Sequence, residues 1–201
     1  MAETETAREP LGLEALGASP ERGFLPVEDP CVELPLRYGA LHELAADLPK
    51  RLLAGRLRAA VESLPVLDMA GLARDRDRRC AMRVLSYLGH AYVWGEPEPA
   101  QRLPASIARP WAQVAEALGR PPVLSYASYA LDNWRRIDRE GPISTDNIEI
   151  VQNFLGGADE DWFISIHVEI EALAAPIVAS VEKPSPSAST YVCISCGASP
   201  S

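Results

Sequence analysis

The segment 156–178, GGADEDWFISIHVEIEALAAPIV, constrains the fold most, because an acidic start leads into a long apolar run that carries one histidine, His167. The acids at 159–161 suit a helix N-terminus, where carboxylates meet free N–H groups and the positive end of the helix dipole. From Trp162 onward the run is apolar nearly all round, which predicts a buried helix. Phe163 and His167 share one face of that helix, which continues through Ile170 and Ala174.

Helical spacing of apolar residues recurs along the rest of the chain and predicts helices at 39–54, 56–64, 78–94, 107–118 and 123–137. Pro49 is expected to kink or split the first of these helices. Residues 147–155 fit either a short helix or a strand. Because strand-like alternation is rare and no internal repeat is visible, we predict an all-α body with at most a small hairpin.

Composition divides the chain into three parts. Residues 1–35 lack sustained periodicity and are interrupted by prolines, so we predict an extended arm that packs on the body through Phe24, Leu25 and Val27. Residues 36–180 form the helical domain, which is long enough for one core. Residues 181–201 are rich in Ser and Pro and predict a disordered tail.

The cysteines are scattered and do not form the disulfide framework of a small secreted protein. Cys80 lies in a helical, half-apolar context and is predicted to be a packed thiol. Cys193 and Cys196 form a lone CxxC in the tail. Because a zinc site needs a second pair of ligands, we interpret this pair as incidental rather than as a metal or redox site.

The formal net charge of −9 argues against binding to nucleic acid or to anionic lipid. The segment 73–79, ARDRDRR, has mixed signs and is predicted to be a solvated face. The N-terminal residues MAETETAREP lack the apolar segment of a secretory signal. No run is expected to reach the roughly 18 apolar residues of a membrane span. We therefore expect a cytoplasmic protein without nucleic-acid or membrane partners.

Three histidines, His42, His90 and His167, are candidate site residues. His42 is predicted to be half-exposed on its helix, and His90 to pack against a neighbour or to bond a carbonyl. Spacing alone favours a hydrogen-bonded core residue over a site residue even at His167. No HExxH, GxSxG or GxxxxGK[ST] motif is present, so the sequence supports neither a zinc protease, a serine hydrolase nor a phosphate-binding loop.

Several segments, taken together and in order from about residue 20 to residue 180, resemble indoleamine 2,3-dioxygenase. They are GFLP at 23–26, the Leu-Pro turns at 48–49 and 64–65, AYVWG at 91–95, LPASIARPW at 103–111, RPPVLSYASYALDNW at 120–134 and the helix at 162–174. The resemblance implies an enzyme containing haem b. Such an enzyme inserts both atoms of O₂ across the C2–C3 bond of an indole and converts L-tryptophan into N-formylkynurenine in the kynurenine pathway.

The resemblance also implies a division of labour between two helical domains. A small N-terminal domain caps the distal side of the haem, and a larger C-terminal domain holds the haem through a proximal histidine. This chain resembles the small domain only, and no histidine follows His167. We therefore expect a truncated chain that lacks the proximal haem histidine, is inactive alone and has a missing C-terminal half as a potential partner.

The resemblance assigns roles to four residues. Tyr126 and Tyr129 fall where the family lines the indole pocket, and Phe163 falls where an aromatic ring packs on the substrate. His167 falls where animal members carry serine and looks like the distal histidine of tryptophan 2,3-dioxygenase. Tyr126, Phe163 and His167 are expected to contact the haem as well as the substrate. A neutral imidazole at His167 accepts the hydrogen bond of the indole N–H and orients the ring, which makes it the predicted catalytic residue.

Two alternative functions stay open from the sequence. In the first, the chain is a non-catalytic helical interaction module whose former domain interface is an apolar patch that binds a partner. In the second, the chain is a haem carrier ligated by His167 or His90.

Overall fold

The computed structural model describes residue 12 and residues 17–181. Over these residues the chain is mostly helical, which confirms the predicted fold class. Short and long helices follow one another with a single small sheet. In chain order they are η2 (Leu36–Tyr38), α1 (Gly39–Ala46), α2 (Leu48–Leu53), α3 (Leu57–Glu62), α4 (Asp75–Trp94), α5 (Ala105–Ala117), η3 (Ala127–Leu131), β1 (Trp134–Arg136), η4 (Thr145–Asn147), β2 (Ile148–Ile150) and α6 (Ala158–Val181).

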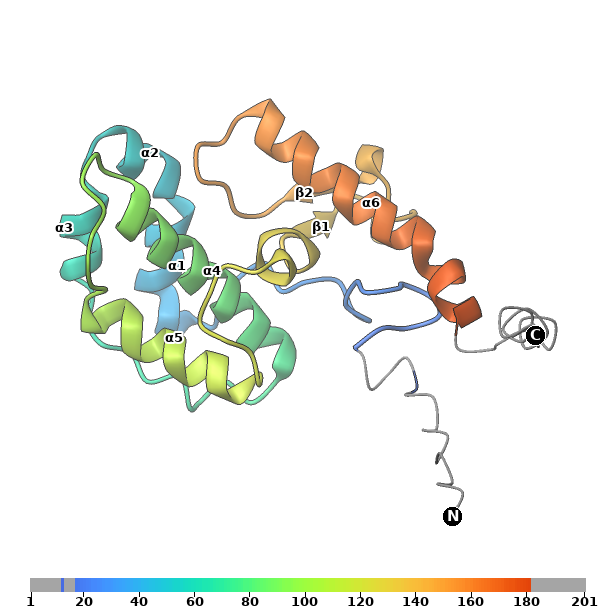
Figure 1. The fold of residues 1–201 in the computed structure, drawn as a ribbon, viewed down its shortest axis with the longest axis horizontal. Helices are drawn as coiled ribbons and strands as arrows, with labels where there is room; N and C mark the ends of the chain where they lie inside the picture. The colour runs from blue at the N-terminus through green and yellow to red at the C-terminus, as the bar shows by residue number, and fades with distance from the viewer. Residues whose placement is uncertain (1–11, 13–16, 182–201) are drawn as a thin grey trace, which may run out of the picture.

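Helix α4 is the centre of one group of helices, α1–α5, which lies on the left in Figure 1. It begins with two acids in its first turn, Asp75 and Asp77, which stabilise the helix N-terminus. Its side chains at 80–92 are almost all buried in the larger hydrophobic cluster. At Gly89 the ring of Trp111 on α5 approaches so closely that an added Cβ would lie 2.5 Å from Cζ3. Glycine therefore sets the spacing between α4 and α5.

Proline and glycine divide the helices largely where the sequence predicts. The helix expected at 39–54 is split, with α1 ending at Ala46 and α2 beginning at Leu48 with Pro49 in its first turn. Pro is tolerated there because the first N–H groups of a helix have no intrahelical partner. Gly119 follows α5 with φ +63°, a conformation that glycine adopts without strain.

The prediction of a helix at 123–137 is wrong over most of that range. Only a short π-helix, η3, forms there, and the chain then turns into strand β1, which pairs antiparallel with β2. The reason is the buried side chain of Asn133. Its amide donates to the carbonyls of Tyr129 and Gln152 and to the Tyr87 hydroxyl at 2.8–3.0 Å, and its oxygen accepts the N–H of Gln152 at 2.8 Å. These long-range bonds replace the helical ladder and create the small hairpin that the sequence left open.

Helix α6 is not buried all round, contrary to the prediction from its apolar composition. Ile164 and Val168 pack inward with Ala130, Trp134 and Ile148 in a second, smaller cluster. Ala175, further along the same face, is buried beside Gly23. The opposite face is apolar and exposed. Its members, each of which is 51–70% exposed, are Trp162, Phe163, Ile170, Leu173 and Ile177. The predicted stripe through Phe163 and Ile170 therefore faces outward, because only one side of α6 meets the rest of the described chain.

The expectation that no segment reaches the length of a membrane span is also wrong. Residues Ala158–Ser180 of α6 are long and apolar enough to cross a membrane by length and composition. Length and composition do not separate a membrane span from a helix that packs on protein by one face, and 22% of the apolar 18-residue window is buried within the structure. The inward side of α6 is therefore explained by packing, whereas no described residue covers its outward side.

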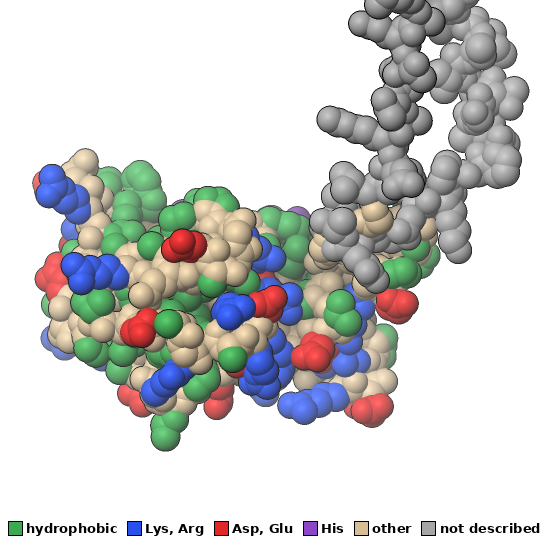
Figure 2. Space-filling view, turned by 90° about the horizontal axis from the view of Figure 1, so that it is seen from below, with side chains coloured by type: hydrophobic (Ala, Val, Ile, Leu, Met, Phe, Trp, Pro, Cys, Tyr) green, Lys and Arg blue, Asp and Glu red, His purple; other side chains and the backbone are tan. Residues whose placement is uncertain are grey.

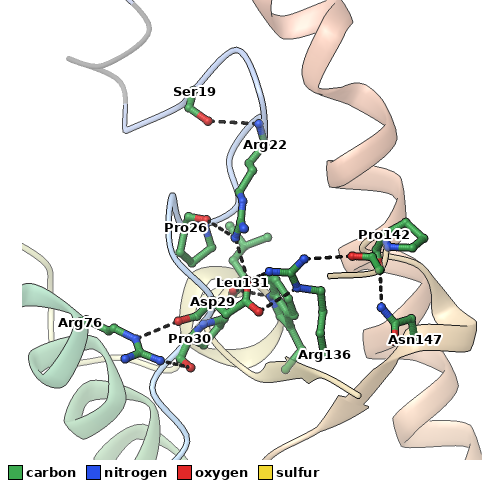
Figure 3. Close-up of polar contacts among 12 residues, drawn as sticks. Ser19, Arg22, Pro26, Asp29, Pro30, Arg76, Leu131, Arg136, Pro142 and Asn147 are labelled. Carbon is green, nitrogen blue, oxygen red and sulfur yellow. Dashed lines mark hydrogen bonds and ion pairs between the residues drawn. The ribbon is translucent and has the colours of Figure 1, made fainter. Parts of the chain in front are cut away.

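The N-terminal arm joins two groups of helices (Figures 1 and 3). One is α1–α5, and the other consists of η3 and α6 with the small sheet. Leu25 is 1% exposed and belongs to the smaller cluster, whereas Phe24 and Val27, which were expected to pack with it, are 45% and 73% exposed. Gly23 has φ +58°, and a Cβ there would lie 2.9 Å from the carbonyl oxygen of Glu171 on α6. Residues 1–11 and 13–16 of the predicted arm and residues 182–201 of the predicted tail lie outside the described part of the chain.

A partly buried ion network holds the arm in place. The Asp29 carboxylate accepts hydrogen bonds from Arg22 at 2.9 Å and from Arg136 at 2.8 and 3.1 Å (Figure 3). Arg76 on α4 donates to the carbonyl oxygens of Asp29 and Pro30 at 2.8 and 3.2 Å. The charged segment 73–79 is thus only partly the solvated face that its sequence predicts, because Asp77 is buried as well. On the face shown in Figure 2, basic side chains are interspersed with acidic ones.

Candidate functional site

The structure brings the four predicted site residues together from two segments. Tyr126 precedes η3 and Tyr129 lies within it, while Phe163 and His167 stand one turn apart on α6. The His167 ring lies between two aromatic rings, with its centroid 4.3 Å from that of Phe163 and 5.9 Å from that of Tyr126. The rings of Tyr129 and Phe163 are 6.1 Å apart. Their proximity was predicted only through the family resemblance, because the two segments are distant in sequence.

The His167 ring has a defined tautomer in its neutral form. Nδ1 lies 2.6 Å from the carbonyl oxygen of Phe163, one turn earlier on α6. Because a carbonyl oxygen only accepts, Nδ1 carries the proton and Nε2 is the acceptor nitrogen. No hydrogen bond from the described residues occupies Nε2. His167 therefore presents a free lone pair beside the exposed apolar face of α6.

Tyr126 closes one edge of this site. Its hydroxyl donates to Glu171 Oε1 at 3.2 Å, and its ring meets His167 edge-on at 73°. Burial raises the pKa of Tyr126 to about 12, and the neighbouring Glu171 carboxylate adds to the effect. The phenol is therefore neutral at physiological pH and is fixed in orientation by its carboxylate partner. Glu171 was not predicted as a site residue, although its spacing of four from His167 places both on neighbouring turns of α6.

Tyr129 forms a second layer behind the exposed rings. It stacks on Tyr87 with centroids 5.8 Å apart, and Phe154 packs against the same Tyr87 ring at 4.5 Å. Burial raises the pKa of the Tyr129 hydroxyl, with a further contribution from the charge of Glu160. Tyr129 is half-buried and joins the two hydrophobic clusters. Because Tyr129 lies beneath the exposed rings, it forms the floor of the site and not its rim.

Glu160 fixes the loop that enters α6. Its carboxylate accepts the backbone N–H groups of Phe154, Leu155 and Gly156 at 2.8, 3.0 and 3.2 Å. This anchoring sets where α6 begins and hence where Phe163 and His167 stand. From the sequence Glu160 was interpreted only as an acid suited to the helix dipole. Its position in the first helical turn after a glycine pair is a capping signal that could have predicted the loop contact.

The exposure of these residues decides whether they could enclose a haem. Phe163 and Tyr126 are 51% and 43% exposed, and with His167 they form one open aromatic surface rather than an enclosed pocket. Such a surface fits one face of a flat apolar ring system and leaves the other face uncovered. In the described part of the chain no group of three or more His, Cys, Asp or Glu residues could hold a metal ion. The described residues therefore offer one open apolar surface to a flat ring system and do not enclose a haem.

His90 and His42 are less suited to ligand binding than His167. His90 Nε2 accepts the backbone N–H of Leu124 at 3.2 Å, and its ring meets Trp111 edge-on. This bond occupies the nitrogen with which His90 would ligate iron, and burial lowers the pKa of His90. His42 is half-buried, as predicted. Cys193 and Cys196 lie outside the described residues.

Comparison with known proteins places the chain in one family. The family model described as "Indoleamine 2,3-dioxygenase" matches residues 13–190. Indoleamine 2,3-dioxygenase 2 of Homo sapiens is 38% identical over 169 residues, which cover 83% of this chain and 41% of the relative. Indoleamine 2,3-dioxygenase 1 of Mus musculus is 38% identical over 154 residues, 76% of this chain and 38% of the relative. A 6-hydroxytryptophan 2,3-dioxygenase of Fusarium equiseti is 32% identical over 157 residues, covering 78% and 39%. The chain belongs to the indoleamine 2,3-dioxygenase family.

The length of the match limits what this chain holds by itself. It spans about two fifths of the length of the curated relatives that it matches. Both segments that build the aromatic site lie within the matched residues 13–190. The family resemblance inferred from the sequence is therefore confirmed, and the roles of Tyr126, Tyr129, Phe163 and His167 stay predictions.

Proposed function

We propose that this chain forms the substrate-side wall of a haem dioxygenase that acts on tryptophan or a related indole. The observation that carries the proposal is the free Nε2 lone pair of His167 on an open aromatic surface. Because the chain spans about two fifths of its relatives, we assign the complete reaction to the chain together with the remainder of the family's length. The haem, when bound, supplies the activation of O₂ at its iron.

The residues of this chain bind and orient the indole. Phe163 and Tyr126 offer flat apolar rings against which an indole packs, and Tyr129 limits how deeply it enters. His167 Nε2 accepts the hydrogen bond of the indole N–H, since Nδ1 is already held by the Phe163 carbonyl. This fixes the rotation of the ring in its own plane and so presents the C2–C3 bond in one orientation. The exposed face of α6 needs a covering surface to exclude water from the reaction.

The test compares an indole that carries an N–H with one that lacks it. The chain is co-produced with a second chain that carries the remaining part of the mouse relative, loaded with haem and assayed for N-formylkynurenine from L-tryptophan. His167→Ala is expected to lower kcat/KM for tryptophan roughly 10- to 100-fold, the value of one lost hydrogen bond in a desolvated site. With 1-methyltryptophan, which has no N–H to donate, the same variant is expected to change kcat/KM by less than about 2-fold.

Two results would contradict the proposal. Equal losses for both indoles would show that His167 acts structurally rather than by accepting the N–H bond. Absence of haem-dependent turnover in an assembled, folded complex would refute the proposed dioxygenase activity. His42→Ala is the matched control, because His42 is a half-buried histidine in another part of the fold. The chain alone with haemin and a reductant is expected to form no N-formylkynurenine, and formation would overturn the division between the two parts.

A non-catalytic interaction module is the alternative function, and the exposed apolar face of α6 favours it. Leu173 and Ile177 are 70% and 68% exposed on the outward face of a helix whose opposite face is packed. In this alternative the chain associates with increasing concentration in sedimentation velocity and develops no haem spectrum. Leu173→Glu is expected to abolish the association, whereas Leu36→Glu, at a leucine on η2 that is even more exposed, leaves it unchanged. Haem binding or turnover in the co-produced complex would decide against this alternative.

A further inference from the structure

Three residues on one side of α4 hold three consecutive residues of the N-terminal arm. Arg76, Cys80 and Arg83 follow one another at helical spacing and so lie along one stripe. Arg76 donates to the carbonyl of Pro30 at 3.2 Å (Figure 3). About two turns further along α4, Arg83 donates to the carbonyl of Val32 at 3.3 Å and to the sulfur of Cys80 at 3.5 Å. Cys31 is thereby fixed opposite Cys80.

The two thiols lie close together. Cys31 packs against the hydrophobic cluster that contains Cys80. The same Arg83 nitrogen that contacts the Cys80 sulfur also donates to the carbonyl of Val32, the residue after Cys31. Cys80 is within hydrogen-bonding reach of the Cys31 sulfur. Cys80 is 1% exposed, whereas Cys31 is half-buried and its thiol donates to the carbonyl of Glu33 at 3.0 Å. A reagent in solution therefore reaches Cys31 and not Cys80.

The surroundings make the two thiols chemically unequal. The hydrogen bond from Cys80 lowers the pKa of Cys31 to about 7, against the effect of burial. The positive charges of Arg76 and Arg83 act in the same direction, and the Asp77 carboxylate acts against them. The pKa of Cys80 is raised by its hydrogen bond to Cys31 and by burial. Because the thiolate is the nucleophile, Cys31 is the reactive partner and Cys80 the resolving one.

We propose that Cys31 and Cys80 form a peroxide-sensitive modification site that closes into an intramolecular disulfide and ties the arm covalently to α4. The Cys31 thiolate attacks one oxygen of hydrogen peroxide, the O–O bond breaks, and hydroxide leaves and takes a proton to become water. The sulfur of Cys80 then attacks the Cys31 sulfenic acid, the S–S bond forms, and the S–O bond breaks. The departing hydroxide takes the proton of the Cys80 thiol as a second water. Two thiols lose two electrons in total, and one peroxide is reduced to two waters.

The disulfide acts on the element that joins the two groups of helices. The same arm places Leu25 in the smaller cluster and runs past α6 at Gly23. In the thiol form the arm is held by hydrogen bonds, by the ion network of Asp29 and by the packing of Leu25. The disulfide closes a loop of about 50 residues, which removes much conformational freedom from the unfolded chain. Oxidation therefore stabilises the attachment of the arm and, through it, the position of α6.

The test uses the full chain with Cys193→Ser and Cys196→Ser, so that Cys31 and Cys80 are the only thiols. After peroxide treatment and alkylation, the intact mass is expected to show a loss of two hydrogens and no alkylated thiol. A digest is expected to yield the peptide cross-linked between Cys31 and Cys80. The melting temperature is expected to rise by about 5 °C or more, and to return after reduction.

Single replacements in the same background separate the roles of the two thiols. With Cys80→Ala, Cys31 is expected to stop at the sulfenic acid, which dimedone labels. With Cys31→Ser, the buried Cys80 is expected to stay unoxidised at the same peroxide dose. The proposal is overturned if Cys31 is driven to sulfinic or sulfonic acid while Cys80 stays alkylatable, if the cross-link forms only between chains, or if both thiols survive a dose that oxidises free cysteine completely.

Discussion

The Asp29 network offers the most direct test of how the arm is held. In Asp29→Asn the side chain keeps its shape and loses its charge. Arg22 and Arg136, which donate hydrogen bonds to the Asp29 carboxylate, stay in place. The side chains of all three are only 17–21% exposed, so their charges are partly removed from water. The variant leaves two guanidinium groups without their counter-ion and turns an amide N–H toward one of them.

The expected loss lies between two limits. Exposed ion pairs contribute up to about 1 kcal/mol, and breaking a fully buried pair costs about 3–5 kcal/mol. Because about a fifth of each side chain here still meets solvent, we expect Asp29→Asn to lower the free energy of unfolding by about 2 kcal/mol. For a chain of this length that corresponds to a melting temperature lower by roughly 4–8 °C. Urea denaturation at pH 7, followed by circular dichroism, measures it.

The same loss has a defined dependence on pH. Burial would raise the pKa of Asp29, but the hydrogen bonds and charges of Arg136 and Arg22 outweigh it and hold the pKa below its usual value. A carboxylate with a lowered folded pKa contributes stability above its unfolded pKa of about 3.9 and loses it as the pH falls through the folded pKa. The difference between wild type and Asp29→Asn is therefore full at pH 7 and shrinks below about pH 4.

Asp75→Asn is the matched control for this prediction. Asp75 pairs with Arg78 on the same helix, but its side chain is 70% exposed, so the same substitution is expected to cost less than about 0.5 kcal/mol. Equal losses in the two variants, or an Asp29→Asn loss that does not change between pH 7 and pH 3, would refute the reasoning that partial burial gives the network its strength.

Three further substitutions test the packing that positions the site. Gly89→Ala is expected to cost about 1–3 kcal/mol in urea denaturation, since its Cβ would press on Trp111, whereas Gly39→Ala, with no atom within 4 Å, is expected to be neutral or stabilising. Asn133→Ala is expected to cost about 3 kcal/mol, because it leaves buried polar groups without partners, and a loss under about 1 kcal/mol would show that the hairpin does not depend on this amide. Glu160→Gln is expected to cost about 1 kcal/mol and to speed amide hydrogen exchange at Phe154, Leu155 and Gly156; unchanged exchange there would contradict its anchoring role.

Local chemistry determined much of the secondary structure. The helix around Leu85 and Leu88, the split at Pro49 and the helix end near Gly119 were all predicted, because apolar spacing, proline and glycine act on neighbouring residues. The helical class of the chain follows from the same periodicity. The motif series also indicated the family, and through it predicted roles for Tyr126, Tyr129, Phe163 and His167 that stay predictions.

Only the tertiary structure decided which faces are covered. Apolar composition predicted that α6 is buried, but composition does not state whether a second surface is present, and the described chain packs against one side of the helix only. The helix predicted at 123–137 failed because Asn133 finds partners on α4 and near β2, which no local pattern shows. The contact of Cys31 with Cys80 and the free Nε2 of His167 likewise depend on side-chain directions. The sequence by itself therefore determined most of the helices and the family, whereas long-range contacts decided the hairpin, how the site is built and which side of it is open.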